Sequence, residues 1–150
     1  MYPPALQALV DLFAGLSESE RRELLIHYAR GSSRHAPQPG EVFDLEDVRH
    51  DAECTDTVGI HLRISDGNRC HFRITLGPEV QTLTRALSCL LCEGLENAPA
   101  GDVVRLPDTF IEQIAGATLV RLRSRTVYYV LKRMKETAHQ WLQRHCAPHS

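Results

Sequence analysis

The sequence predicts an α+β fold in which one β-hairpin stands between two helical regions. Two runs within residues 58–76 alternate apolar and polar side chains at a period of two, and Asp66-Gly67 separates them. This pattern is typical of a hairpin with one buried face, because glycine accepts the positive φ of a tight turn. Two strands alone are marginally stable, so we expect a third from the segment before Cys54. The result is a small antiparallel sheet of about three strands, covered by helices.

The region before the hairpin is predicted to contain two helices. Apolar residues recur at helical spacing after Pro3-Pro4, which indicates a short helix ending near Gly15. Ser17-Glu18-Ser19-Glu20 has the pattern of a capping box, so a second helix begins there and ends at Gly31. Periodicity then fades, and we expect an acidic loop with a short strand at Val42 to Leu45.

The two faces of the hairpin carry different side chains. His61 and His71 lie on the outer face, where cross-strand pairing would bring them together. Two imidazoles without a carboxylate or thiolate at ligand spacing make a weak metal site, so we expect both at the surface. The inward set consists of Val58, Ile60, Leu62, Ile64, Cys70, Phe72, Ile74 and Leu76.

The region after the hairpin is predicted to be helical. A broad apolar stripe between Gly77-Pro78 and Gly94 is typical of a helix at the centre of a core. The later segments are a short turn or helix over Asp102 to Leu106, a helix from Pro107-Asp108 to about Gly116, a linking segment over Leu119 to Arg123, and a last helix from about Ser124 to Arg144.

Length and composition indicate one globular domain over residues 1–150. Hydrophobic residues make up 43% and charged residues 24%, enough for one core. The formal charge is -2 and no basic stripe is interleaved with aromatic residues, so nucleic acid is not an expected partner. No apolar run reaches the length of a membrane span, and the first residues lack the basic region of a signal peptide. We therefore expect a cytoplasmic protein without membrane attachment.

One cysteine has the position of a reactive group. The five cysteines are an odd number in a chain with a sizeable core, which favours reduced thiols over a disulfide framework. Cys54 ends the acidic loop just before the hairpin, where a loop can hold or release a thiol. Glu53 and Asp56 oppose formation of its thiolate. Two interpretations stay open: a cysteine without a reaction, and a thiol that a partner must activate.

Other chemistry is less well supported. Cys89 and Cys92 have the CxxC spacing of redox and metal motifs, but they lie inside an apolar helix, which favours core packing. His50 could pair with Cys54, yet no glycine-rich oxyanion turn accompanies them. The sequence also lacks a phosphate-cradling loop and a dinucleotide fingerprint.

Several strings resemble the SufE-like family of sulfur acceptors over most of the chain. The paired opening helices of that family resemble PPALQALVDLFAGLSESERRELLIHYAR, and its active loop resembles ECTDTV. The hairpin, the central helix and the closing pattern resemble ISDGNRCHFRI, LTRALSCLLCEGL and FIEQIAGATLVRLRSRTVYYVLKRMK.

The resemblance implies a SufE/NifU-like fold and a covalent carrier rather than an enzyme. Cys54 takes the position of the cysteine that bears the persulfide, and Arg123 that of an arginine associated with docking to the desulfurase. The implied partner is a PLP-dependent, SufS-like cysteine desulfurase, and the implied process is iron-sulfur cluster assembly, with an Fe-S scaffold complex as a further implied partner. The resemblance implies no cofactor or metal on this chain, because PLP is bound by the partner.

The active loop departs from the family pattern. Glu53 replaces a glycine, Asp56 a serine and Gly59 an aromatic residue, and Thr126 stands where a glycine is typical. We therefore carry three hypotheses: a sulfur carrier on Cys54, an adaptor that binds a desulfurase without moving sulfur, and a thiol redox protein using Cys89 and Cys92.

Overall fold

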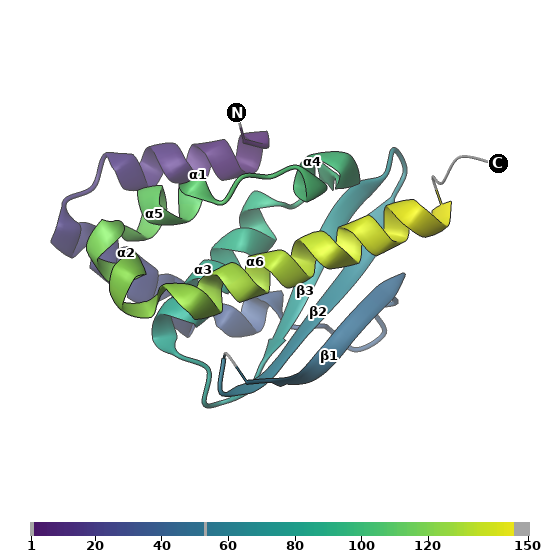
Figure 1. The fold of residues 1–150 in the computed structure, drawn as a ribbon, viewed down its shortest axis with the longest axis horizontal. Coiled ribbons are helices and arrows are strands. Elements are labelled where there is room, and N and C mark those ends of the chain that lie inside the picture. Colours follow the sequence, from purple (N-terminus) through teal and green to yellow (C-terminus); the bar gives the residue numbers. More distant parts are fainter. Residues whose placement is uncertain (1, 53, 146–150) are drawn as a thin grey trace.

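A computed structural model describes residues 2–52 and 54–145, without the side chains of residues 117–125 and 127. The predicted α+β class is confirmed: two helices precede the sheet and further helices follow it (Figure 1). The elements are α1 Pro4–Ala14, α2 Glu18–Arg30, the 3-10 helix η1 Ser32–His35, β1 Leu45–Asp51, β2 Asp56–Ser65, β3 Arg69–Leu76, α3 Thr82–Gly94, β4 Ala98–Pro99, α4 Ala100–Val104, α5 Thr109–Ala115 and α6 Ala117–His145.

The sheet is an antiparallel meander in the order β1-β2-β3-β4. The hairpin of β2 and β3 turns as predicted, with positive φ angles of 81° at Gly67 and 57° at Asn68. A third strand does precede Cys54, but it is β1 at Leu45–Asp51, and the strand predicted at Val42 to Leu45 is wrong. The two-residue β4 makes one strand more than expected.

Helices α3 and α6 cover one face of the sheet (Figure 1). Val58, Ile60, Leu62 and Phe72 are fully buried against them, as predicted for the inward face of the hairpin. Burying each such side chain contributes about 1.5–3 kcal/mol relative to leaving it in water. Ile64 and Leu76 lie at the ends of this apolar row and are only half-buried.

The N-terminal helices have the predicted signals. Glu20 and Ser17 form a reciprocal capping box, with the Glu20 amide 3.2 Å from Ser17 Oγ and the Ser17 amide 2.9 Å from Glu20 Oε1. Because this box satisfies two amides that have no partner within the helix, α2 begins directly after the α1 turn. Gly31 caps its other end.

The predicted linker at Leu119 to Arg123 is wrong, because the backbone of α6 is helical from Ala117 onward. The break between α5 and α6 is at Gly116, whose φ is 89°. A residue with a β-carbon is strained at this angle, so the glycine can separate two helices without a longer connection.

The outer face of the sheet buries His61, against the prediction that it is a surface residue. Its imidazole is only 5% exposed and lies 2.6 Å from Glu46 Oε2 and 2.8 Å from Thr75 Oγ1. Phe43 packs on the ring, with the centroids 5.2 Å apart. In the β2/β3 register His61 faces Arg73, so it is not the cross-strand partner of the other hairpin histidine.

Candidate functional site

Cys54 lies in the short connection between β1 and β2, at the end of the sheet from which β3 leads to α3 (Figure 1). Its amide donates to the Asp51 carbonyl oxygen over 3.0 Å, which closes a tight turn. The side chain points inward and is only 2% exposed. The Sγ atom lies 3.9 Å from the Thr126 carbonyl oxygen of α6 and donates to it. The thiol is therefore buried between the sheet and the last helix.

The first stem of this loop is tied to α6 by a buried arginine. Arg133 is 2% exposed, and its guanidinium lies 3.1 Å from Asp47 Oδ2 and 3.3 Å from Asp51 Oδ2. It also donates to the Asp47 carbonyl oxygen over 2.7 Å. A buried guanidinium needs such partners, because an unpaired charge in a protein interior is costly. The end of β1 is thus fixed just before the connection that contains Cys54.

The second stem is tied to the β3–α3 connection by Asp56. Its carboxylate accepts from the Thr57 and Glu79 amides, each over 2.7 Å. These backbone hydrogen bonds lower the pKa of Asp56 below its ordinary value. The carboxylate fills the space beside Gly77, where a β-carbon would overlap it. The aspartate that departs from the family pattern therefore has a structural role at the base of the loop.

Thr126, another departure from the family pattern, links α6 to α3. Its hydroxyl lies 2.5 Å from Thr84 Oγ1, and Thr84 is buried. The same residue supplies the carbonyl oxygen beside Cys54 Sγ. The two helices are therefore held together at the point where the thiol is stored.

The residue that follows Cys54 has an unusual backbone conformation. Thr55, directly after the cysteine, has a φ of 59°, in the left-handed region that non-glycine residues rarely adopt. Its hydroxyl donates to the Cys54 carbonyl oxygen over 2.7 Å. Asp51 and Asp56, on either side of Cys54, are anchored by independent contacts.

The remaining described cysteines belong to the core. Cys70 is fully buried in β3, and Cys89 and Cys92 are buried in α3, as the apolar helix predicted. Burial raises the pKa of Cys70 to about 12 and that of Cys89 to about 11, and it raises that of Cys92 as well. Thiolates are disfavoured at all three sites. Of the four cysteines that the structure describes, Cys54 alone lies in a connection between elements.

Two predicted residues cannot be placed in the site. Glu53 and the side chain of Arg123 lie outside the described part of the chain. The backbone of Arg123 is part of α6. Over residues 2–52 and 54–145, no cluster of three or more potential metal ligands is found.

The sequence analysis missed Arg133 and Thr126 as residues that hold the site. A signal existed for the arginine, since position 133 falls beside Val130 and Met134 on the apolar side of the last helix. A charged residue on that side calls for a buried acidic partner. No pattern indicated that Thr84 and Thr126 would meet, because they are far apart in the chain.

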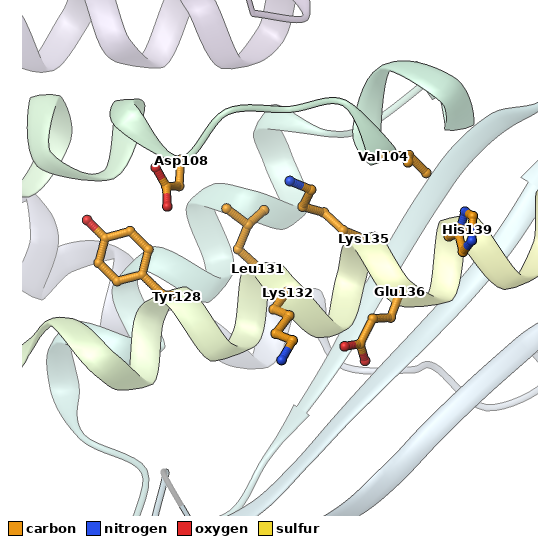
Figure 2. A pocket seen from close by; sticks show the side chains of 8 residues that line it. All are labelled: Val104, Asp108, Tyr128, Leu131, Lys132, Lys135, Glu136 and His139. Atoms are coloured by element: carbon orange, nitrogen blue, oxygen red, sulfur yellow. The ribbon is translucent and has the colours of Figure 1, made fainter.

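A pocket of about 450 Å³ lies on the other side of α6, against the connection between α4 and α5 (Figure 2). Tyr128 and Asp108 face each other at one end, and Val104 and His139 lie at the other. Lys135 crosses toward the connection and donates to the Leu106 carbonyl oxygen over 2.7 Å. Neither Cys54 nor its stems line this pocket.

The model of the SufE family, described as Fe-S metabolism associated domain, matches residues 7–138. The chain belongs to the SufE family. Two uncharacterized SufE-like proteins, from two strains of Mycobacterium tuberculosis, are each 28% identical over 134 residues, covering 89% of this chain and 90% of theirs. The predicted resemblance is thereby confirmed.

A solved structure supports the fold of this SufE protein. The solution structure of a hypothetical protein from Thermus thermophilus superposes with a TM-score of 0.75 at 24% identity, covering 95% of this chain and 99% of that one. Within the described residues, no helix is both long enough and apolar enough to cross a bilayer. Family membership associates the protein with Fe-S metabolism.

Proposed function

We propose that this protein accepts sulfur from a PLP-dependent cysteine desulfurase and carries it as a persulfide on Cys54 toward iron-sulfur cluster assembly. The observation that carries the proposal is the position of Cys54, in a loop with two anchored stems, in a chain of the SufE family. Cys70, Cys89 and Cys92 are set inside regular elements and argue against a redox role for the CxxC pair.

The transfer needs no cofactor on this chain. The Cys54 thiolate attacks the outer sulfur of a cysteine persulfide on the desulfurase, and the desulfurase thiolate leaves. Cys54 then carries the additional sulfur, and the desulfurase is ready for another turnover. The protein therefore acts as a carrier and as an activator, and Arg123 contributes to docking.

Activation comes from the partner in this scheme. Cys54 is 2% exposed in the isolated chain, and its loop must open for the two sulfur atoms to meet. Docking would supply the free energy for that opening, because binding can stabilise a conformation that is otherwise rarely populated. Holding the two thiols in register is then the main contribution to the rate.

The burial of Cys54 also favours a second candidate, an adaptor that binds and stimulates a desulfurase without moving sulfur. The adaptor would use the same docking surface and keep the thiol enclosed. The two functions differ in whether sulfur is found on Cys54.

The test is to incubate the protein with a cysteine desulfurase and cysteine, and to measure intact mass together with desulfurase turnover. We expect the chain to become one sulfur atom heavier, with the sulfur mapped to Cys54. The Cys54→Ser variant should lose both the added mass and the stimulation, whereas the control Cys89→Ala should keep both. Stimulation that survives in Cys54→Ser would favour the adaptor. Arg123→Ala should weaken the stimulation while Cys54 remains able to react at high desulfurase concentration.

A further inference from the structure

A second, smaller pocket adjoins the Cys54 loop and has a polar, mixed-charge lining. It holds about 370 Å³, within the range of small-molecule sites. Its wall on the sheet side is the end of β1 and the first loop residue, and its wall on the helix side is one face of α6. The lining consists of Arg49, His50, Asp51, Ala52, Tyr129, Lys132, Arg133 and Glu136.

The pocket and the thiol are neighbours through two routes. Along the loop, Asp51 lines the pocket and its carbonyl oxygen accepts from the Cys54 amide over 3.0 Å. Along α6, the carbonyl oxygen beside Cys54 Sγ belongs to Thr126, one helical turn before Tyr129, which lines the pocket. The pocket therefore adjoins both the turn that carries Cys54 and the helical segment that its thiol contacts.

The lining offers charges of both signs that the protein itself does not pair. Among the ion pairs of the described residues, none includes Lys132 or Glu136. The Lys132 ammonium lies over the Tyr129 ring, 5.9 Å from its centroid. By contrast, Arg133 is occupied by Asp47 and forms a fixed floor. An available ammonium and an available carboxylate in one small pocket complement a zwitterion.

Arg49 adds a positive charge at the sheet side. It is 57% exposed and lies 3.4 Å from Asp47, so its pairing is weak and easily shared with a ligand. A ligand carboxylate is thus attracted by Arg49 and Lys132, and a ligand ammonium by Glu136.

We infer that this pocket binds a low-molecular-weight thiol that carries an α-amino and a carboxylate group, and that this thiol takes sulfur from Cys54. The inference rests on the proposed function, because it needs a persulfide on Cys54. The thiolate of the ligand attacks the outer sulfur of Cys54-S-SH, and the S–S bond to Cys54 breaks. The ligand becomes a persulfide, Cys54 returns as a thiol with the proton that the ligand lost, and no net oxidation occurs.

The pocket in Figure 2 serves as the internal comparison. It shares Lys132 and Glu136 with the pocket beside Cys54. These two side chains extend from one side of α6, and Lys135 extends from the opposite side. Since the two pockets share these residues, a variant at either would disturb both. Arg49 lines only the pocket beside Cys54 and is therefore the informative position.

The test begins with protein loaded on Cys54 by an inorganic polysulfide and desalted, so that no desulfurase is required. Loss of the added sulfur is followed by intact mass after addition of cysteine, mercaptopropionate, cysteamine or mercaptoethanol. We expect the rate of sulfur loss to saturate as the cysteine concentration rises. At low cysteine concentration, this rate should be roughly tenfold above the rate expected from the fraction of cysteine present as thiolate. Arg49→Ala should reduce the cysteine rate roughly threefold to tenfold and leave the mercaptoethanol rate unchanged.

The control variant is Arg105→Ala, which removes another exposed arginine that pairs with an aspartate, Asp102, far from the loop. It should behave as the unaltered protein does. Four thiols that react according to thiolate fraction alone, or an Arg49→Ala variant without effect, would overturn the inference while Cys54 loading supports the proposed function. Failure of polysulfide to load Cys54 in a chain that a desulfurase does load would overturn the inference alone, because a small thiol could not reach Cys54 in the isolated chain. Failure to load from the desulfurase as well would overturn both.

A second experiment, without sulfur transfer, measures only the binding of a ligand to the pocket. Serine, which has a hydroxyl in place of the thiol, should shift amide NMR signals at Arg49, Ala52 and Lys132 with a saturable dependence. Absence of these shifts together with sulfur transfer only to a protein thiol would assign the pocket to a macromolecular acceptor and reject the small thiol.

Discussion

At the scale of single residues, Asp56 fixes one side of the candidate site. It accepts from two amides on separate segments and occupies the space that Gly77 leaves open. The serine that is typical at this position in the family has a shorter side chain and no charge. In this protein, the aspartate therefore fixes the second stem of the Cys54 loop to the β3–α3 connection.

Replacing Asp56 should loosen the loop without dissolving the core. We expect Asp56→Ala to react faster with a thiol reagent at Cys54, because both amides lose their acceptor. Reaction at Cys70, inside β3, should not change. Equal acceleration at both cysteines would show general unfolding instead, and no acceleration at Cys54 would show that the loop is fixed by other contacts.

The same residue gives a pH dependence of defined sign. The pKa of Asp56 is lowered in the folded chain, chiefly by the Glu79 amide. The contribution of Asp56 to stability is therefore complete at pH values above the ordinary pKa of aspartate. It is lost as the pH falls through the lower pKa that Asp56 has in the folded chain. Asp56→Asn should accordingly show a smaller loss of unfolding free energy between about pH 6 and pH 3, checked by urea titration. Parallel curves for the two proteins would contradict this assignment.

At the scale of elements, the attachment of β1 to α6 depends on one arginine. Asp47 and Asp51 lie on the face of β1 that points toward the helices, and Arg133 bonds to both. The strand has no apolar row comparable with those of β2 and β3, and the ion pairs compensate for this. The first stem of the Cys54 loop is consequently as well fixed as the second.

Removing Arg133 should destabilise the chain by about 3 kcal/mol, because two carboxylates near the core lose their counter-charge. Arg133→Met keeps much of the side-chain volume, so the loss in urea unfolding reports mainly the charge. The triple variant Arg133→Met, Asp47→Asn, Asp51→Asn should recover part of that stability. A triple variant that is no more stable than Arg133→Met would attribute the loss to packing.

At the scale of the whole molecule, one apolar core joins the sheet face, α3, α6 and the N-terminal helices. Cys54 packs into this core from the connection between β1 and β2, whereas Cys70, Cys89 and Cys92 are buried within regular elements. The protein therefore combines a thiol that a local opening can expose with thiols that need the fold to open.

Thiol labelling of the native chain should separate these two classes. We expect Cys54 to react well before Cys70, Cys89 and Cys92. Leu91→Ala, which should cost about 2–5 kcal/mol, should accelerate the three core cysteines and leave Cys54 nearly unchanged. Residue-resolved mass spectrometry gives all four rates in one experiment. Cys54 rates that follow the core rates would contradict local opening.

The elements with a regular pattern of apolar residues could be predicted from the sequence. The elements made mostly of charged residues could not. The hairpin, the capping box at Ser17 and the apolar stripe of α3 are local patterns, and the structure confirms them. The limits of β1 were missed because its residues are mostly charged, and the start of α6 was missed because Gly116 alone breaks the chain there. His61 was predicted at the surface because a strand pattern does not reveal what covers its outer face.

The sequence by itself determined the fold class, the family and the singular position of Cys54 between a loop and a hairpin, because each depends on residues that are neighbours in the chain. Only the tertiary structure decided that the thiol is enclosed against Thr126, that Asp56 and Arg133 anchor its two stems, and that a pocket with mixed charge adjoins it. Those contacts join residues far apart in sequence, and their geometry arises only when the sheet and α6 pack together.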